Sequence, residues 1–270
     1  MFVNRNNFYR TDIVTKARRM GFWLTKFNGK GGNMSLIPID FHSSWNDFLC
    51  DEVREELKEI ENKIGKNINP DYENVLRFLK CDLNKIKVVI LGQDPYPEKG
   101  RATGRAFEVG DLHSWNDKFR QVSLKNIIRL IHKNYNNIYE YNKILKFSEI
   151  QREIAEGKFG IAPPDRLFKS WEKQGVLLLN TYFTVECGVT GSHISIWEPF
   201  SCRLLDYISR ENKNISWFLW GKSSEEKSRY IKSGRFYVSR HPMMCSERYE
   251  DDFLRNDCFK DTMGIINWLG

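Results

Sequence analysis

The sequence lacks the short motifs that identify several common kinds of enzyme. No G-x-G-x-x-G follows an expected strand, and there is no P-loop, no H-E-x-x-H and no G-x-S-x-G. These absences disfavour nucleotide cofactors, zinc proteolysis and the usual serine esterase chemistry.

Cysteine pairs and long apolar runs are missing as well. The six cysteines are scattered, with no C-x-x-C pair and no ligand-like spacing to any of the five histidines. We expect reduced thiols of an intracellular protein, mostly in its core. No window approaches the about 18 uninterrupted apolar residues of a membrane span, and the N-terminus lacks a signal peptide's apolar region. The sequence predicts a soluble protein of the cytoplasm, or of the nucleus or an organelle if the source is eukaryotic, with no membrane partner.

The chain does contain an excess of positive charge. Its 270 residues include 42 Lys and Arg against 35 Asp and Glu, a formal net charge of +7. Such a balance makes a polyanionic partner such as nucleic acid plausible. Residues 1–33 are basic and nearly free of acids, so they are interpreted as a DNA-contacting arm, a targeting extension, a segment held on the surface or a start-site artefact. Residues 34–270 are expected to form a single catalytic domain.

Four short apolar runs separated by helical patterns predict the fold. The expected strands are residues 88–91, 176–179, 216–220 and 236–238. Expected helices begin at Ser44 and Ser123, and further helices cover Trp197–Ile208, 223–231 and Phe259–Leu269. Strands that alternate with helices favour an α/β fold, here a three-layer α/β/α arrangement around a central, mainly parallel four-stranded sheet.

A polar residue follows each expected strand closely. These residues are Asp94, Asn180, Lys222 and His241. Parallel strands bring their carboxyl ends to one edge of a sheet, which is where open α/β proteins bind ligands. A single Asn, Gly-Lys or His-Pro is more often an ordinary turn, but four such coincidences together indicate a site.

The residue types suit the recognition of a planar, hydrogen-bonding ring. An Asn side chain offers a donor and an acceptor side by side. Phe107 or Tyr96 could stack on the ring or wall it off, and the basic balance suits a phosphate backbone. Acting on a base of duplex DNA requires that the base be extruded into a pocket.

Several of these segments resemble motifs of family 1 uracil-DNA glycosylases. Lys87–Tyr96 (KVVILGQDPY) looks like the family's water-activating motif, and Gly104–Phe107 resembles its stacking-phenylalanine segment. Ser170–Thr181 resembles the uracil-reading segment, and Phe218–Gly221 followed by Arg240–Pro242 is similar to the ends of the third and fourth strands. The match runs in order from about Trp45 to the C-terminus, and motifs of this length are far more specific than single residues.

The resemblance implies a DNA-repair hydrolase that flips uracil out of DNA and cleaves its N-glycosidic bond. An abasic site would remain, with no lyase step and no metal or organic cofactor. Asp94 would orient the attacking water and stabilise the positive charge of the sugar, and His241 would donate a hydrogen bond to uracil O2.

The resemblance also implies how the base is recognised. Asn180 would pair with uracil N3–H and O4, and would reject cytosine, whose donors and acceptors are reversed. Tyr96 would fill the space beside C5 and exclude thymine. Phe107 would stack on the ring, and backbone groups of Gln93 would complete the pocket.

The DNA-contacting segments depart from the family's pattern. Pro97 stands where the family usually has His, and Gly221-Lys222 replaces a Gly-Ser phosphate loop. The family's His-Pro-Ser-Pro-Leu-Ser, whose leucine wedges into the duplex, corresponds to residues 241–246. The expected DNA contacts are Ser123, Gly221, Lys222, Met243, Met244, Cys245 and Ser246. Cys245 stands in the leucine's place and is smaller, so Met243 or Met244 is expected to wedge, or the wedge is weak.

Two other functions stay open at this point. The chain could be a DNA-binding or replication-accessory protein on a glycosylase fold, or a glycosylase for a modified pyrimidine. The expected partner is uracil-containing DNA, single- or double-stranded, bound by a monomer. A proteinaceous inhibitor at the DNA-binding face is also considered.

Overall fold

A computed structural model describes residues 35–270, so the expectations for residues 1–33 lie outside the described part of the chain. Its central sheet has four strands, β2 (Val88–Gly92), β3 (Val176–Asn180), β5 (Ser216–Trp220) and β6 (Arg235–Ser239). Their order is β3-β2-β5-β6, and every neighbouring pair is parallel. The predicted parallel four-stranded sheet is confirmed.

The register of the strands sets their carboxyl ends level. Gly92 is paired with Asn180, Leu91 with Leu219, and Trp220 with Ser239. The residues that follow these positions therefore leave the sheet at one edge. This is the geometry in which α/β proteins place their ligands.

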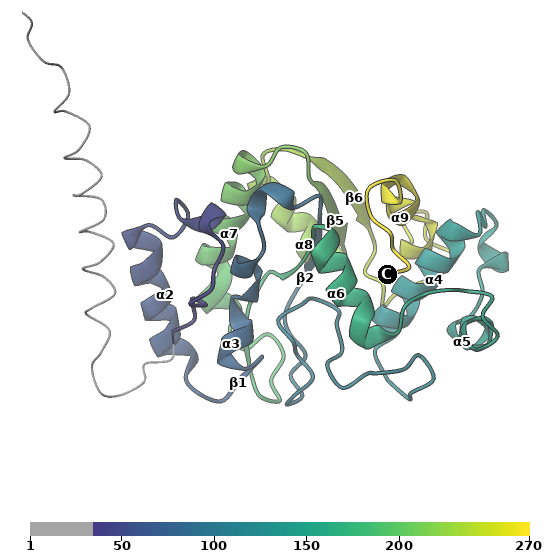
Figure 1. The fold of residues 1–270 in the computed structure, drawn as a ribbon, viewed down its shortest axis with the longest axis horizontal. Coiled ribbons are helices and arrows are strands. Elements are labelled where there is room, and N and C mark those ends of the chain that lie inside the picture. Colours follow the sequence, from purple (N-terminus) through teal and green to yellow (C-terminus); the bar gives the residue numbers. More distant parts are fainter. Residues whose placement is uncertain (1–34) are drawn as a thin grey trace, which may run out of the picture. The chain divides into compact units, whose positions relative to one another are not determined.

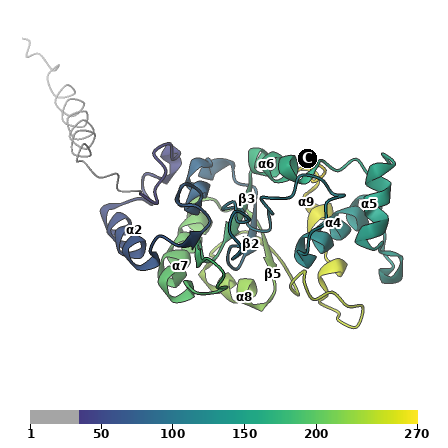
Figure 2. The same ribbon diagram turned by 90° about the horizontal axis from the view of Figure 1, so that it is seen from below.

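Helices cover both faces of the sheet (Figures 1 and 2). On one face, α2 (Asp51–Ile64) and α7 (Ile194–Glu211) bury strand residues that include Leu91 and Leu219. On the other, α4 (Val122–Tyr135), α6 (Pro164–Gln174) and α9 (Cys258–Thr262) bury residues that include Ile90 and Phe218. Because both faces are covered, the central strands are apolar at successive positions rather than alternating.

Shorter elements connect these layers. The strands β1 (Ile68–Asn69) and β4 (Val185–Glu186) form a separate antiparallel pair. The remaining α-helices are α3 (Tyr72–Val75), α5 (Phe147–Ala155) and α8 (Lys222–Glu226). The 3₁₀ helices are Ser43–Trp45, Arg77–Lys80, Leu83–Lys85, Tyr141–Lys143, Lys227–Tyr230 and Phe253–Arg255. No helix within residues 35–270 is long and apolar enough to cross a membrane.

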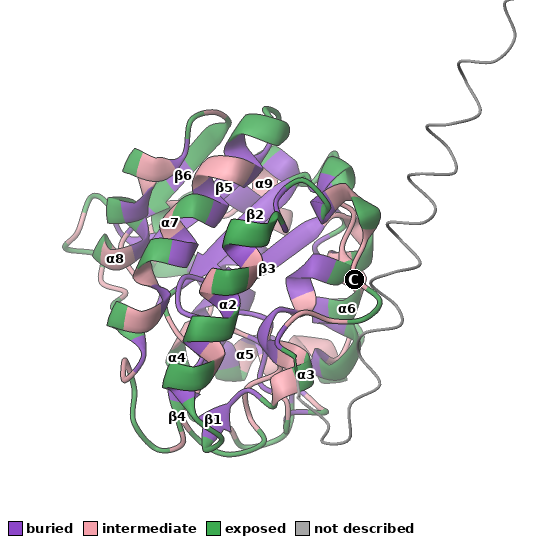
Figure 3. Cartoon of the chain, turned by 90° about the vertical axis from the view of Figure 1, so that its left-hand side faces the viewer, coloured by how far each residue is buried: buried purple, intermediate pink, exposed green. Residues whose placement is uncertain are grey.

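The first long helix begins later than the sequence predicts. Ser44 lies in a 3₁₀ turn capped by His42, and its hydroxyl accepts a hydrogen bond from the backbone N–H of Leu83. Because that hydroxyl is used across the fold, it does not cap α2, which starts at Asp51. The predicted apolar stripe of α2 is nevertheless buried, and Figure 3 shows the helix exposed on its outer side only.

Two other boundaries differ from the expectation. Trp171, expected beside the second strand, lies in α6, which ends at Gly175 in a left-handed conformation. The last helix stops at Thr262 instead of running to Leu269. Its apolar pattern continues in irregular chain because Trp268 turns back, and its indole N–H donates to the Thr262 hydroxyl.

We predict that Leu57→Ala lowers the free energy of unfolding by about 2–5 kcal/mol, since Leu57 is 2% exposed and truncation leaves a cavity in the apolar core where α2 packs beside α7. The neighbouring Lys58→Ala is the matched control. It removes only an exposed ion pair with Glu55, which is worth about 0.5 kcal/mol or less. Urea denaturation of both variants checks this, and equal losses would contradict the assigned packing of α2.

Candidate active site

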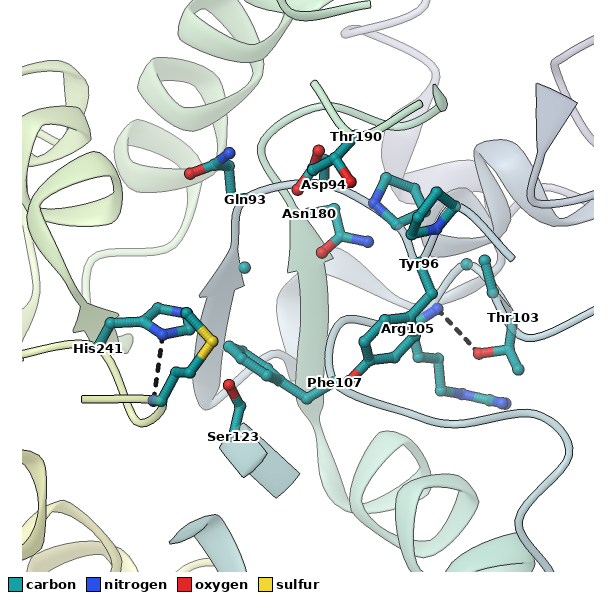
Figure 4. A pocket seen from close by; sticks show the side chains of 16 residues that line it. Gln93, Asp94, Tyr96, Thr103, Arg105, Phe107, Ser123, Asn180, Thr190 and His241 are labelled. Carbon is teal, nitrogen blue, oxygen red and sulfur yellow. Dashed lines mark hydrogen bonds between the residues drawn. The ribbon is translucent and has the colours of Figure 1, made fainter. Parts of the chain in front are cut away.

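A pocket opens at the carboxyl edge of the sheet (Figure 4). Its volume is about 240 Å³, below the about 300–1,000 Å³ of sites for drug-sized ligands, so it suits one small ring. Six of the residues predicted from the sequence to bind or transform a base line it: Gln93, Asp94, Tyr96, Phe107, Asn180 and His241. They come from the ends of β2, β3 and β6 and from the segment after β2.

The absence of a side chain at Gly92 makes room for Asn180. A Cβ atom at Gly92 would lie 2.5 Å from Asn180 Oδ1 and 3.0 Å from Ala106 Cβ. Any larger residue would therefore push the carboxamide away. Asn180 is only 8% exposed, so its donor and acceptor face the pocket with little competition from water.

Asp94 is held by a loop that is distant in the sequence. The backbone N–H of Gly191, in the loop between β4 and α7, donates to Asp94 Oδ2 over 2.7 Å. Burial raises the pKa of the Asp94 carboxyl above its ordinary value, and the Gly191 N–H acts against that rise because it favours the carboxylate. The loop therefore both orients the carboxylate and helps to keep it ionised.

Gln93 contributes its backbone rather than its side chain to the fold. Its carbonyl accepts a hydrogen bond from the N–H of Tyr182 over 2.8 Å. The bond extends the contact between β2 and β3 beyond the ends of the two strands. The side chain of Gln93 is exposed at the mouth of the pocket.

His241 has a defined tautomer when it is neutral. The backbone N–H of Met243 donates to His241 Nδ1 over 3.2 Å, so the ring proton must sit on Nε2. Burial lowers the pKa of the imidazole below its ordinary value, which favours the neutral ring. Gly221, with φ of +87°, lets the ring lie close, because a Cβ there would be 2.8 Å from His241 Cβ.

Phe107 adopts a backbone conformation that is unusual for its residue type. Its φ angle is +65°, in the left-handed region that side chains other than Asn and Asp rarely occupy. The ring centroid lies 5.6 Å from that of Trp220 and 6.3 Å from that of His241. The conformation directs the ring into the pocket, which Tyr96 lines next to it (Figure 4). Burial raises the pKa of Tyr96, which keeps its phenol protonated.

Five of the seven residues predicted to contact DNA line two hollows. Ser123, in the first turn of α4, and Met243 line the base-sized pocket. Gly221, Lys222 and Met244 line an adjoining hollow of about 490 Å³, and His241 borders both. Lys222, predicted to meet the other strand-end residues, thus lies beside their pocket rather than in it.

Cys245 and Ser246 line neither hollow. The Cys245 thiol donates to the carbonyl of Pro242 over 3.4 Å and packs against the apolar core, where burial raises its pKa to about 12. The N–H of Ser246 donates to Asp252 Oδ2. Met243 and Met244 are instead 58% and 57% exposed, so they are the apolar side chains of this loop that face outward.

The structure adds pocket residues that the sequence did not predict. They are Pro95, Pro97, Ala102, Thr103, Gly104, Arg105 and Thr190. Thr190 precedes Gly191, and no local pattern marks that loop as a partner of Asp94, 97 residues away. Pro97, expected to lose a side-chain contact, is anchored through its carbonyl, which accepts from Asn69 Nδ2 and from the N–H of Gly188.

The arrangement surrounds a ring-sized space with a carboxylate, a carboxamide and an imidazole N–H donor. Within residues 35–270, no three His, Cys, Asp or Glu side chains are grouped to hold a metal ion. Fold and pocket together define an α/β protein with a ring-sized pocket, lined by aromatic and hydrogen-bonding side chains, at the carboxyl edge of a parallel sheet.

Comparison with known proteins gives the family. A family model described as the Uracil DNA glycosylase superfamily matches residues 79–263. A uracil-DNA glycosylase of Francisella tularensis subsp. holarctica is 34% identical over 210 residues, which cover 74% of this chain and 83% of that protein. One of Mycoplasmopsis pulmonis is 34% identical over 188 residues, covering 68% and 71%. The chain belongs to the uracil DNA glycosylase superfamily.

Solved structures share the fold. The mimivirus uracil-DNA glycosylase aligns with a TM-score of 0.55 and 25% identity, covering 75% of this chain and 69% of that chain. The enzyme described as UNG from Nitratifractor salsuginis aligns with a TM-score of 0.62 and 22% identity, covering 83% and 91%.

We predict that the imidazole of His241 titrates below pH 6.5, because burial opposes its charged form. The ring is then charged only at pH values below that lowered pKa and stays neutral above it. An NMR titration of the histidine resonances measures this, with His241→Ala to assign the signal. A midpoint above 6.5 would contradict the environment described for the ring.

Proposed function

We propose that the protein removes uracil from DNA by hydrolysing the N-glycosidic bond, leaving an abasic site without a lyase step. The observation that carries the proposal is one pocket in which a half-buried carboxylate, Asp94, and the Nε2–H of His241 border the same base-sized space as Asn180. Membership in the uracil DNA glycosylase superfamily supports it.

The proposed chemistry follows from the charges that develop as the bond breaks. Positive charge forms on the sugar, where the Asp94 carboxylate stabilises it and orients the attacking water. Negative charge forms on the departing uracil. Neutral His241 donates through Nε2 to uracil O2 and stabilises that charge without transferring its proton first. Asp94 acts as the carboxylate and His241 as the neutral imidazole. Activity should therefore fall as the pH is lowered through the pKa of either group.

Recognition is assigned to three further side chains. Asn180 accepts from uracil N3–H and donates to O4, a pattern that cytosine reverses. Phe107 stacks on the ring, and Tyr96 stands beside C5, where it excludes the methyl group of thymine. The order of the motifs along the chain supports membership in family 1, a finer assignment than the superfamily.

The proposed partner is uracil-containing DNA. Ser123 and Lys222 are offered as phosphate contacts, and the exposed pair Met243 and Met244 as the wedge, in place of the inward-facing Cys245. A mimivirus UNG variant 25% identical to this chain has been solved in complex with UGI. We extend this to a proteinaceous inhibitor at the DNA-binding face here. The monomeric state and cytoplasmic localisation stay predictions from the sequence.

Release of free uracil from a uracil-containing oligonucleotide tests the proposed function. We expect release by the native protein, and a loss of about 10²-fold or more for Asp94→Asn, because the variant cannot stabilise the sugar's charge. Asn180→Ala should lose activity mainly through uracil recognition. No release of any base by the native protein would refute the proposed function, and release of 5-modified pyrimidines alone would change its substrate.

We predict that Tyr96→Ala admits thymine. The truncation opens space beside C5, so thymine release from a thymine-containing oligonucleotide should become measurable while uracil release continues. Gel analysis of abasic sites in matched uracil and thymine substrates checks this. A variant that still rejects thymine as the native protein does would contradict the role given to Tyr96.

We predict that single-stranded uracil substrates are processed faster than double-stranded ones, because flexible methionines replace the family's leucine wedge. Met244→Leu should raise the rate on duplex DNA more than on single strands. Single-turnover rates on the two substrates measure both effects. If the native protein processed single- and double-stranded substrates at equal rates, the methionines would not limit its activity on duplex DNA, and the prediction would be wrong.

A further inference from the structure

The strained backbone of Phe107 requires a support. A positive φ at a residue with a bulky side chain persists only where the surrounding structure fixes it. The residues on both sides of Phe107 supply such a support. Glu108, which follows it, and Arg105, two residues before it, are 5% and 8% exposed although both are charged side chains.

The carboxylate of Glu108 closes residues 103–108 into a clasp. Its Oε2 atom accepts hydrogen bonds from the Thr103 hydroxyl and from Arg105 Nη1, the latter over 2.9 Å. Both donors precede Phe107 and the acceptor follows it. The backbone between them therefore bends through the conformation seen at Phe107.

The clasp is tied to the rest of the fold by a second carboxylate. Arg105 Nη2 donates to Glu172 Oε2 over 2.6 Å, and Glu172 lies on α6. Arg77 also donates to Glu172 Oε2, over 3.4 Å, and to the carbonyl of Thr103, over 3.2 Å. Two positive and two negative side chains thus form one network at the wall of the pocket, which Arg105 also lines.

The network holds charges in a setting where water is scarce. Burial alone would raise the pKa of Glu172, but its bonds and charge interactions with Arg105 and Arg77 outweigh this and lower it. Buried ion pairs of this kind contribute little net stability compared with apolar packing, and their best-attested use is to specify one arrangement. Here the arrangement that they specify includes the orientation of the pocket's aromatic wall.

We propose that Arg105 and Glu108 are positioning residues for the base: their clasp holds Phe107 in the conformation that stacks on the ring in the pocket. The inference rests on the proposed function for the identity of the ring. Neither side chain touches the reacting atoms in this proposal, and both act through Phe107.

A double-mutant cycle tests the proposal. Glu108→Gln keeps the volume of the side chain, removes its charge and leaves Arg105 paired with Glu172. We expect it to lower kcat/KM for uracil release about tenfold and to weaken inhibition by free uracil by a similar factor. In the Phe107→Ala background the same change should alter kcat/KM by less than about twofold, because the ring that it positions is gone.

A distant pair provides the matched control. Asp257 pairs with the buried Lys133 at the far end of α4, and Asp257→Asn removes one charge of that pair. It should lower thermal stability without changing uracil inhibition in either background. If Glu108→Gln lowered kcat/KM by the same factor in the Phe107→Ala background as in the native protein, the proposal would be overturned. Glu108 would then act independently of the Phe107 ring.

Two measurements keep the outcome decisive. Arg105→Lys retains the charge but not the two-pronged geometry, so it should reproduce part of the loss if Glu108→Gln does not fold. Amide hydrogen exchange across residues 103–108 should be faster in either variant whichever base the protein acts on. Unchanged exchange would overturn the clasp, whereas an inactive native protein with faster exchange in the variants would contradict only the proposed function.

Discussion

The close contact between Asn180 and the backbone at Gly92 is the constraint on which the site depends. The two residues are partners in the parallel register, and the carboxamide occupies the space that a Cβ would take. A shift of the register by one residue would turn every strand side chain to the other face and would place a leucine against the amide. The packing of both faces of the sheet therefore also fixes the donor and acceptor that Asn180 presents to the pocket.

Burial has opposite consequences for the two ionisable groups of the pocket. It lowers the pKa of His241, which favours the neutral ring that the proposed chemistry uses. It raises the pKa of Asp94, which disfavours the carboxylate that the chemistry needs. The N–H of Gly191, in the loop before α7, opposes the rise of the Asp94 pKa by donating to the carboxylate. His241 needs no such correction, because burial already favours its neutral form. Partial burial thus favours the neutral imidazole, and the contact with Gly191 favours the carboxylate in the same pocket.

The sequence predicted the strand ends well because each strand is a short apolar run that stops at a polar or turn residue. The parallel sheet then brings those ends together without further information, as it does for Asp94, Asn180 and His241. Contacts between distant segments could not be predicted in this way. Gly191 meets Asp94 across 97 residues and Arg105 meets Glu172 across 67, and neither pair has a periodic pattern that marks it. The predicted start of the first helix was wrong for a related reason. The Ser44 hydroxyl accepts a hydrogen bond from the backbone N–H of the distant Leu83 and does not cap α2.

The loop after β6 is anchored at both ends, and the methionine side chains between its anchors are exposed. The carbonyl of Pro242 accepts from the buried Asn126 side chain over 2.6 Å, and Asp252 accepts from the N–H of Ser246 over 2.6 Å. Between these anchors the side chains of Met243 and Met244 are exposed. The same loop orients His241 through the N–H of Met243, so the imidazole and the outward methionines are held by one short segment. An unbranched methionine adapts its shape to a base stack but loses more conformational freedom than a branched leucine when it is ordered. Under the proposed function, we therefore expect differences at Met243 and Met244 to affect how DNA is opened, and the anchors of the loop to keep His241 in place.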